Sequence, residues 1–196
     1  MLVTVSGAIR QPGVYEVEIG TAIGEVLMRA GGPAERPQAI LTGGYFGTWL
    51  PAEAAWQVPL ARSSLRDAGG AMGAGILVVL PQSCCGLAET ARVVRYLADS
   101  GAGQCGPCIF GLPALADALE DLAYRGGRGN AVDRVAGLIP LIEGRGACRH
   151  PDGATQLAAS AFRAFRHDAR RHDGDGPCFG VNEPPLLPIP GKAGSW

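Results

Sequence analysis

A Cys-x-x-Cys pair on a glycine-rich turn constrains this chain more than any other feature. The pair lies in Gln104-Cys105-Gly106-Pro107-Cys108, directly before a segment with helical periodicity. Two thiols three residues apart on a turn can point at one metal ion or inorganic cluster. The same spacing also occurs in thiol redox pairs and among buried cysteines without a chemical role. Ligands elsewhere in the chain must therefore distinguish these three interpretations.

The length and charge of the chain limit its fold and its partners. Its 196 residues suffice for two small domains, and a net charge of −1 gives no support for nucleic-acid binding. No apolar run is long enough to span a membrane, and strand-like sequence follows Met1 directly, so we expect neither an export signal nor membrane insertion. Six cysteines in such a chain predict metal ligands or buried thiols rather than disulfides. We therefore expect a reducing compartment, the cytoplasm by default, with any membrane attachment made through partners.

Residues 1–82 have the pattern of a small α+β domain. Strand-like alternation at residues 2–6 and 14–17 flanks a Gln11-Pro12-Gly13 turn and predicts a β-hairpin. A helix is predicted to follow, with Thr21 as its N-cap. Further strands are predicted at residues 39–42, 49–50, 56–60 and 76–80. Together these elements predict a sheet that packs around a single helix.

Two stretches of this domain could contact a ligand. Glycines at residues 69–75 include a G-x-x-G-x-G spacing, but they precede a strand instead of following one. A tight backbone crossing is therefore favoured over a nucleotide-binding loop. Four aromatic residues surround the Gly43-Gly44 turn. We expect them to pack in the core of the small sheet, and a patch that faces a ligand or partner is the alternative. They are Tyr45, Phe46, Trp49 and Trp56.

From residue 83 the periodicity becomes helical. Apolar stripes predict four short amphipathic helices, the first ending near Asp99 and the third kinked or shortened at Pro140. Asp152 is predicted to cap the fourth helix. Brief links between the helices favour a bundle over residues 83–171. Residues 172–196 have neither a helical nor a strand period and predict an extended, Pro/Gly-rich tail.

A third candidate ligand, Cys148, lies in the loop before the last predicted helix. Cys105, Cys108 and Cys148 can converge at one end of a bundle, where soft thiolates suit an iron–sulfur cluster or zinc. His150 shares the loop with Cys148, and imidazole replaces thiolate in some iron–sulfur and many zinc sites. We predict these four residues as the metal site, with a solvent-bound iron as the alternative to His150. A cluster, a zinc ion and an empty, vestigial site all remain open at this point.

A series of short motifs connects the chain to a known family. In chain order they are Val5-Ser6-Gly7, Gln11-Pro12-Gly13-Val14-Tyr15-Glu16-Val17, Gly31-Gly32, Gly43-Gly44, Val58-Pro59-Leu60, Gly73-Ala74-Gly75-Ile76-Leu77-Val78-Val79, Gly103-Gln104-Cys105-Gly106-Pro107-Cys108 and Gly146-Ala147-Cys148. With them the chain resembles the C-terminal half of the NADH-binding flavoprotein subunit of respiratory complex I, that is, the family of NADH-quinone oxidoreductase F subunits. Related hydrogenase and formate dehydrogenase subunits share the resemblance.

This resemblance implies an SLBB-like domain (a soluble-ligand-binding β-grasp) followed by a helical iron–sulfur-binding domain. In the family a 4Fe-4S cluster is held by Ser-Cys-Gly-x-Cys-x-Pro-Cys and one distant Cys, and it takes electrons from FMN that NADH has reduced. Two departures stand out. Ala102 occupies the position of the first cluster cysteine, and the flavin- and NADH-binding domain is absent from this sequence. FMN and NADH are therefore expected only on a partner or a further domain.

The remaining cysteines and histidines have simpler interpretations. Cys84-Cys85 would form a strained ring if paired, so they are predicted to be buried small hydrophobes, remote from the Cys-x-x-Cys pair. Cys178 is predicted to be a free thiol in the tail. His167 and His172 lie in a charged segment that is interpreted as a solvated helix end, or alternatively as a docking patch for an acidic electron carrier.

The sequence therefore predicts an electron-transfer module. It would relay single electrons through a 4Fe-4S-type cluster held by three cysteines and a non-cysteine fourth ligand. Its partners would be a flavin- and NADH-binding protein or domain and a ferredoxin-like or other iron–sulfur subunit. The alternative is a non-redox ligand- or partner-binding scaffold with a structural zinc or a vestigial site. No serine–histidine–aspartate set or carboxylate pair emerges from the sequence, so no catalytic residue is assigned, and no complete active site is expected on this chain.

Overall fold

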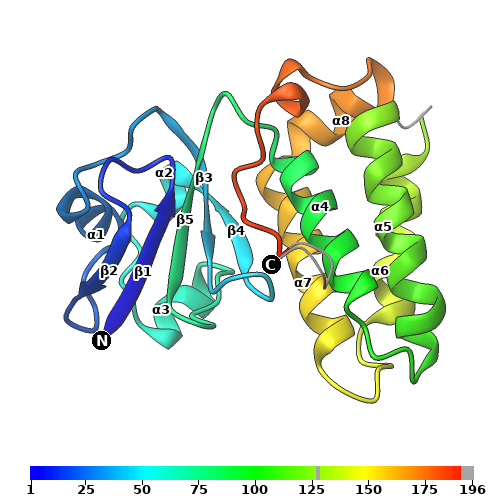
Figure 1. Ribbon diagram of the computed structural model, residues 1–196, viewed down its shortest axis with the longest axis horizontal. Coiled ribbons are helices and arrows are strands. Elements are labelled where there is room, and N and C mark those ends of the chain that lie inside the picture. The colour runs from blue at the N-terminus through cyan, green and yellow to red at the C-terminus, as the bar shows by residue number, and fades with distance from the viewer. Residues whose placement is uncertain (127–128, 191–196) are drawn as a thin grey trace.

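The protein folds into a five-stranded sheet unit followed by a helical unit, which pack side by side (Figure 1). The computed structural model describes residues 1–126 and 129–190. This arrangement confirms the predicted α+β class. The sheet unit holds β1 (Leu2–Gly7), β2 (Gly13–Glu16), α1 (Ile23–Arg29), β3 (Pro37–Thr42), β4 (Thr48–Pro51), α2 (Ala52–Ala55), α3 (Arg62–Asp67) and β5 (Ile76–Pro81).

The strands lie in the order β2-β1-β5-β3-β4. β1 and β5 are parallel, whereas the other neighbouring strands are antiparallel. The predicted hairpin is confirmed, with Leu2 opposite Glu16 and Val5 opposite Gly13. β1 must end in glycine, because Gly7 has a φ of 82° and a β-carbon there would lie 2.4 Å from the carbonyl oxygen of Val79. This tight contact fixes how the hairpin sits against the central strand β5.

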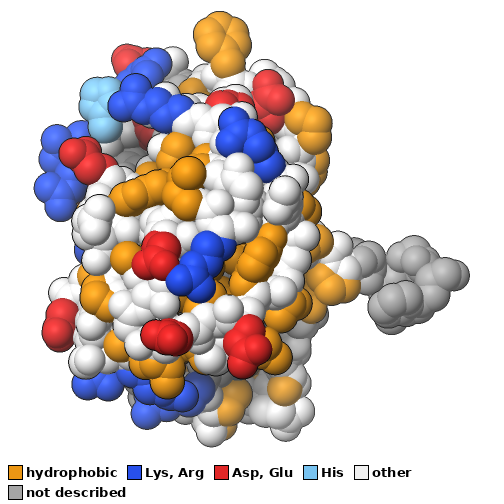
Figure 2. Space-filling view, turned by 90° about the vertical axis from the view of Figure 1, so that its left-hand side faces the viewer, with side chains coloured by type: hydrophobic (Ala, Val, Ile, Leu, Met, Phe, Trp, Pro, Cys, Tyr) orange, Lys and Arg blue, Asp and Glu red, His pale blue; other side chains and the backbone are white. Residues whose placement is uncertain are grey.

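Both faces of the sheet are buried, and alternation along the strands decides which residue faces which side. Ile40 and Val79 point into a core shared with α1, together with Val26 and Leu27. Leu41 and its neighbours on the opposite face point into a core shared with the helical unit. The outward surface around α1 and β2 carries hydrophobic side chains dispersed among acidic and basic ones (Figure 2). The prediction of a single helix in this unit was incomplete, because Ala55 of α2 and Leu65 of α3 share the core with α1. The sheet is therefore a layer between the helices of its own unit and the helical unit.

Trp49 is the main side chain joining the two units. It is 1% exposed, its Nε1 donates to Thr90 Oγ1 at 3.0 Å, and its ring meets Phe165 edge-on at 5.5 Å. Its backbone N–H donates to Ser160 Oγ at 2.9 Å. The sequence predicted that Trp49 packs in the core of the small sheet. The structure corrects this prediction, because Trp49 packs between the sheet and the helices. The face of β4 that points away from α1 packs on helices of the second unit. The sequence of the sheet unit alone did not indicate this contact.

Two local predictions in the sheet unit were wrong. The segment 56–60 is not a strand, since it forms only one isolated bridge, between Pro59 and Ala22. Thr21 does not cap α1: its hydroxyl donates to the carbonyl of Glu18, and the helix begins after Ala22. Both failures have one cause. The segment 56–60 pairs with the start of α1, where the backbone N–H of Ile23 donates to the carbonyl of Val58, and local sequence patterns do not predict this contact.

The helical unit contains five α-helices and two π-helical turns among the described residues. They are α4 (Gly86–Asp99), a π-turn (Pro107–Gly111), α5 (Leu112–Glu120), a π-turn (Asp121–Arg125), α6 (Ala131–Ile142), α7 (His150–Ala164) and α8 (Arg166–Gly174). α4 ends at Asp99 as predicted, and α6 continues two residues past Pro140. α7 begins at His150, so Asp152 is not its cap. Instead, the Asp152 carboxylate accepts the backbone N–H of Gly144 at 2.8 Å.

Residues 175–190 of the tail are extended, apart from a short 3₁₀ turn at Phe179–Asn182, and they lie between the two units (Figure 1). The buried Glu89 carboxylate accepts the backbone N–H groups of Leu186 and Leu187 at 3.0 and 2.9 Å. The same carboxylate pairs with Arg92 at 2.9 Å, and Leu187 is 1% exposed. Leu186 and Leu187 therefore hold this part of the tail against α4. The division at residues 82 and 171 stays a prediction, since α8 and the tail pack on the helices before them.

None of the helices in the described residues has the length and apolar character needed to cross a lipid bilayer.

Candidate metal centre

The Cys-x-x-Cys pair lies in the connection between α4 and α5, as the sequence predicted. The backbone N–H groups of Cys108 and Ile109 both donate to the carbonyl of Cys105 at 3.0 Å, so the pair sits on a tight turn. Cys105 is half-buried, and Cys108 is buried. Gly103, at φ 65°, supplies a left-handed backbone conformation just before the pair. The turn therefore presents both thiols at one end of the helical unit.

Cys148 approaches the pair from the loop between α6 and α7. The backbone N–H of Ala147 lies near the Cys105 thiol, and the thiol of Cys148 is close enough to interact electrostatically with Cys108. Gly146 allows this approach, since a β-carbon there would lie 2.8 Å from the carbonyl oxygen of Cys148. The fold thus brings together the three cysteines that the sequence singled out. Cys148 remains exposed, so the site opens to solvent.

The two thiols of the pair differ in acidity. Hydrogen bonds from the backbone N–H groups of Ala147 and Cys108 lower the pKa of Cys105. Burial raises the pKa of Cys108, and its hydrogen bond to Cys105 adds to this effect. A thiolate that accepts backbone N–H bonds is stabilised before any metal arrives, as is common in iron–sulfur and zinc sites. Cys105 is therefore the thiol best prepared to bind first.

At least two of the three thiols stand farther apart here than two ligands of one bound zinc ion would. Around one tetrahedral zinc, two thiolates lie about 3.8 Å apart. The donor atoms of Cys105, Cys108 and Cys148 do not all lie within 4.8 Å of one another. A cluster is larger than an ion, so its ligands stand farther apart. The three soft donors, their spacing and the open glycine-rich loops fit an iron–sulfur cluster.

His150 does not point freely into this site. Its Nε2 lies 2.7 Å from the carbonyl oxygen of Leu97, so this nitrogen carries the proton and donates it. The ring also meets Phe46 edge-on, with 5.4 Å between ring centroids. Only Nδ1 is left as a possible metal donor. These contacts tie the start of α7 to the end of α4 and to the sheet unit.

Ala102 lies in the exposed loop between α4 and the Cys pair, and its methyl side chain offers no donor atom. Its neighbour Gly101 lies against Cys108: a β-carbon on that glycine would be 3.6 Å from the Cys108 sulfur. The chain therefore has no thiol at the position where the resemblance implies the first cluster cysteine.

A second group of potential ligands was missed by the sequence analysis. His172 was expected at a solvated helix end, but it is 1% exposed and lies beside Cys85 and Cys178. The charged sequence around it misled the prediction, since only this side of α8 faces the bundle. Cys178 is a tail residue, as expected, but the tail folds back to the start of α4. The only feature of the sequence that could have predicted this group is the short spacing between His172 and Cys178, and that spacing alone is a weak indication of a metal site.

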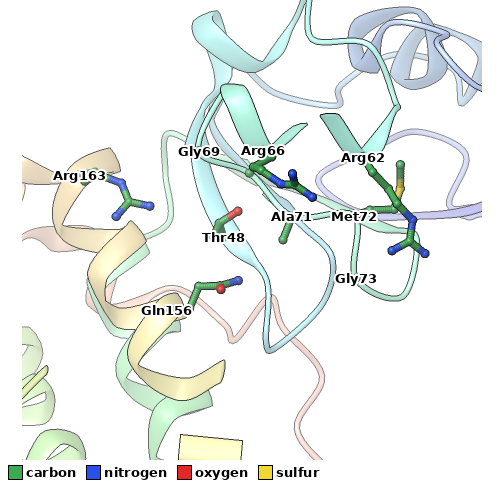
Figure 3. A pocket seen from close by; sticks show the side chains of 10 residues that line it. Thr48, Arg62, Arg66, Gly69, Ala71, Met72, Gly73, Gln156 and Arg163 are labelled. Carbon is green, nitrogen blue, oxygen red and sulfur yellow. The ribbon is translucent and has the colours of Figure 1, made fainter. Parts of the chain in front are cut away.

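A pocket of about 400 Å³ lies between α3 and α7, at the junction of the two units. Arg62, Arg66 and Arg163 line it, with Gln156 and the glycine loop 69–73 (Figure 3). None of these three arginines forms an ion pair with the residues that the structure describes. Their charge attracts anions in general. The pocket shares no lining residue with the cysteine site, and the glycine loop precedes β5 as expected for a backbone crossing.

Comparisons with known proteins agree with the geometry. The family model described as the NADH-ubiquinone oxidoreductase-F iron-sulfur binding region matches residues 88–172, and the SLBB domain model matches residues 2–45. The second NADH-quinone oxidoreductase F subunit of Rhizobium meliloti (strain 1021) is 28% identical over 174 residues, which cover 87% of this chain and 41% of that protein. The corresponding protein of Streptomyces coelicolor is 27% identical over 173 residues, covering 87% and 38%.

A solved structure shows the same arrangement. The crystal structure of an NAD⁺-reducing nickel–iron hydrogenase in the air-oxidised state superposes with a TM-score of 0.74 at 26% identity, covering 86% of this chain and 29% of the hydrogenase chain. The chain spans about two fifths of the length of the curated relatives. The fold and the two family-model matches together define a protein with an SLBB domain joined to an iron–sulfur-binding region. Along most of its length the chain is similar to part of the NADH-quinone oxidoreductase F subunits.

Proposed function

We propose that this protein is an electron-relay module that carries one 4Fe-4S cluster on Cys105, Cys108 and Cys148. The observation that carries the proposal is the convergence of these three thiols from two loops, within a segment that matches an iron-sulfur binding region. When bound, the cluster would accept and release single electrons. The role of the chain is to hold it, to set its potential and to fix its distance from partners.

The fourth iron would have a ligand other than cysteine, because Ala102 replaces the expected thiol. Solvent is the ligand we favour, because Cys148 is exposed and the site opens outward. His150 is the alternative and would have to bind through Nδ1, since Nε2 donates to the carbonyl of Leu97. Either ligand leaves less negative charge around the iron than four thiolates would.

The proposal requires partners on both sides of the relay. A flavin- and NADH-binding protein or domain would supply electrons, as the names of the NADH-quinone oxidoreductase relatives suggest. A ferredoxin-like protein or another iron–sulfur subunit would accept them. The protein would then work in the reducing cytoplasm and reach a membrane only through such a complex. The exposed arginines of α8, Arg166, Arg170 and Arg171, are available to contact an acidic carrier.

Anaerobic reconstitution with iron and sulfide tests the proposal directly. We expect a brown protein with broad visible absorption and about four irons and four sulfides per chain. The reduced protein should give an electron paramagnetic resonance signal of a single cluster. Colourless protein that retains no iron after reconstitution would contradict the proposal. One tightly bound zinc at Cys105, Cys108 and Cys148 would favour a structural site instead.

The His150→Ala and His150→Gln variants test the fourth ligand. If solvent occupies that position, both variants should keep about four irons, with an unchanged resonance spectrum, because His150 only links α7 to Leu97 and Phe46. Thermal stability should fall, and less in the Gln variant, whose amide can still donate to Leu97. A changed spectrum or a loss of iron in both folded variants would instead assign His150 as a ligand.

A further inference from the structure

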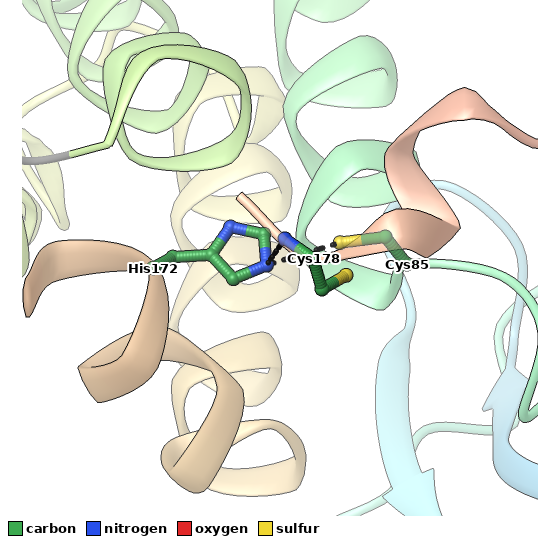
Figure 4. Close-up of side chains that lie close together, drawn as sticks. All are labelled: Cys85, His172 and Cys178. Atoms are coloured by element: carbon green, nitrogen blue, oxygen red, sulfur yellow. Dashed lines mark hydrogen bonds between the residues drawn. The ribbon is translucent and has the colours of Figure 1, made fainter. Parts of the chain in front are cut away.

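We propose that Cys85, His172 and Cys178 form a second metal site that binds one zinc ion, separate from the cluster site. The three residues come from different segments: the residue before α4, the C-terminal turn of α8 and the tail. In the described residues they form the one group of three potential ligands whose donor atoms all lie within 4.8 Å of one another. Figure 4 shows the imidazole and the thiols facing one another.

The separation of Cys85 and His172 is close to that around a tetrahedral ion, and all three donor atoms lie within 4.8 Å of one another. With Zn–S of about 2.3 Å and Zn–N of about 2.05 Å, a sulfur and a nitrogen ligand are about 3.6 Å apart and two sulfurs about 3.8 Å. The observed separation of Cys85 Sγ and His172 Nε2 is 3.8 Å. Two thiolates and one imidazole also form a donor set that zinc prefers over magnesium or calcium.

The surroundings of His172 fix the tautomer that a metal requires. Nδ1 lies 3.2 Å from the carbonyl oxygen of Leu122, so Nδ1 carries the proton and donates it. Nε2 therefore presents its lone pair toward the thiols, where it accepts the backbone N–H of Cys178 at 3.1 Å. Zinc binding would have to replace this hydrogen bond. Metal-binding histidines typically donate their second nitrogen to a backbone carbonyl in this way.

The thiol of Cys85 is placed in a similar manner. It accepts the backbone N–H of Ala88 at 3.4 Å, in the first turn of α4. N–H groups of this kind stabilise a thiolate bound to a metal. Cys85 and His172 are both buried, so water competes little for their donor atoms. Cys178 is half-buried and leaves the fourth coordination position to solvent.

The backbone is shaped to return Cys178 to this position. The Cys85 N–H donates to the carbonyl of Gly180 at 3.2 Å, which aligns the tail with the start of α4. Gly180 cannot carry a side chain there, because a β-carbon would lie 2.7 Å from the carbonyl oxygen of Ser83. α4 has 14 residues and is therefore about 21 Å long, and the cluster cysteines follow its other end. The two sites are thus separate, and a zinc ion here would cross-link α4, α8 and the tail.

Cobalt binding to the full chain tests this site. The cluster cysteines are first replaced by serine (Cys105→Ser, Cys108→Ser and Cys148→Ser), and circular dichroism checks the fold. Titration with Co²⁺ should give about one equivalent of a tetrahedral species, with thiolate-to-cobalt charge transfer and intense visible bands, displaced by Zn²⁺. The further change His172→Ala should weaken binding by at least 10- to 100-fold, whereas His167→Ala, on the exposed side of the same helix, should not.

A second measurement does not depend on how these variants fold. In the unaltered protein, zinc should protect the half-buried Cys178 from alkylation, while Cys84, also half-buried, keeps its reactivity, as mass spectrometry of each peptide would show. A tetrahedral cobalt spectrum together with this protection supports the site. The proposal is overturned if the folded protein gives no such spectrum, if the spectrum survives both Cys178→Ser and His172→Ala, or if Cys85 and Cys178 are found joined as a disulfide in reducing buffer.

Discussion

Replacing Cys148 by serine is expected to abolish assembly of the iron–sulfur cluster. Iron after anaerobic reconstitution should fall from about four per chain to less than one, because only the adjacent thiols of Cys105 and Cys108 would remain. Two ligands on one turn cannot enclose a cluster, whereas Cys148 reaches it from a second loop. Iron and sulfide analysis, with the visible spectrum, measures the effect.

Cys84→Ser is the matched control, because this half-buried cysteine precedes α4 and lies far along the chain from the site. The control should bind as much iron as the unaltered protein.

The opposite change, Ala102→Cys, should supply the missing thiolate and lower the reduction potential by on the order of 100 mV, since more negative charge surrounds the iron. Equal iron content in Cys148→Ser and the parent would contradict the ligand assignment. An unchanged potential in Ala102→Cys would show that position 102 does not reach the cluster.

The Trp49→Ala variant is expected to lose about 3–5 kcal/mol of unfolding free energy. The indole is 1% exposed and fills the interface between β4 and the helices, so its removal leaves a cavity bordered by Phe165. It also leaves the Thr90 hydroxyl without the indole N–H donor. Urea unfolding followed by circular dichroism measures the loss.

Trp56→Ala is the appropriate comparison, since it deletes the same side chain from a half-buried position on the other side of the sheet. Its loss should be smaller, because more of this indole already contacts water. Similar losses for the two variants would mean that the contact between the units contributes no more than an ordinary surface cluster. Because a loosened interface would also move α7, the Trp49 variant should assemble its cluster less efficiently.

Local patterns predicted much of the fold. The alternating residues of the hairpin, the apolar run of β5 and the stripe of α4 each depend on neighbours in sequence, and each formed where it was expected. The strand predicted at residues 56–60 failed because its backbone pairs with the start of α1 instead. The exposed position predicted for His172 failed for a related reason. The residues that surround it, Leu122 and Cys178, are 50 and 6 positions away, and no local period reports such contacts.

The sequence by itself determined the Cys105–Cys108 pair, its likeness to a cluster-binding motif and the missing thiol at Ala102. These features depend only on residue types and on their short spacing along the chain. Residues so close in sequence stay close in space, whatever surrounds them. Only the tertiary structure decided that Cys148 reaches the pair, that His150 Nε2 is occupied by Leu97 and that Cys178 returns to Cys85 and His172. Those outcomes depend on how α4, α7, α8 and the tail pack, because burial of their apolar faces sets distances between residues that are far apart in the chain.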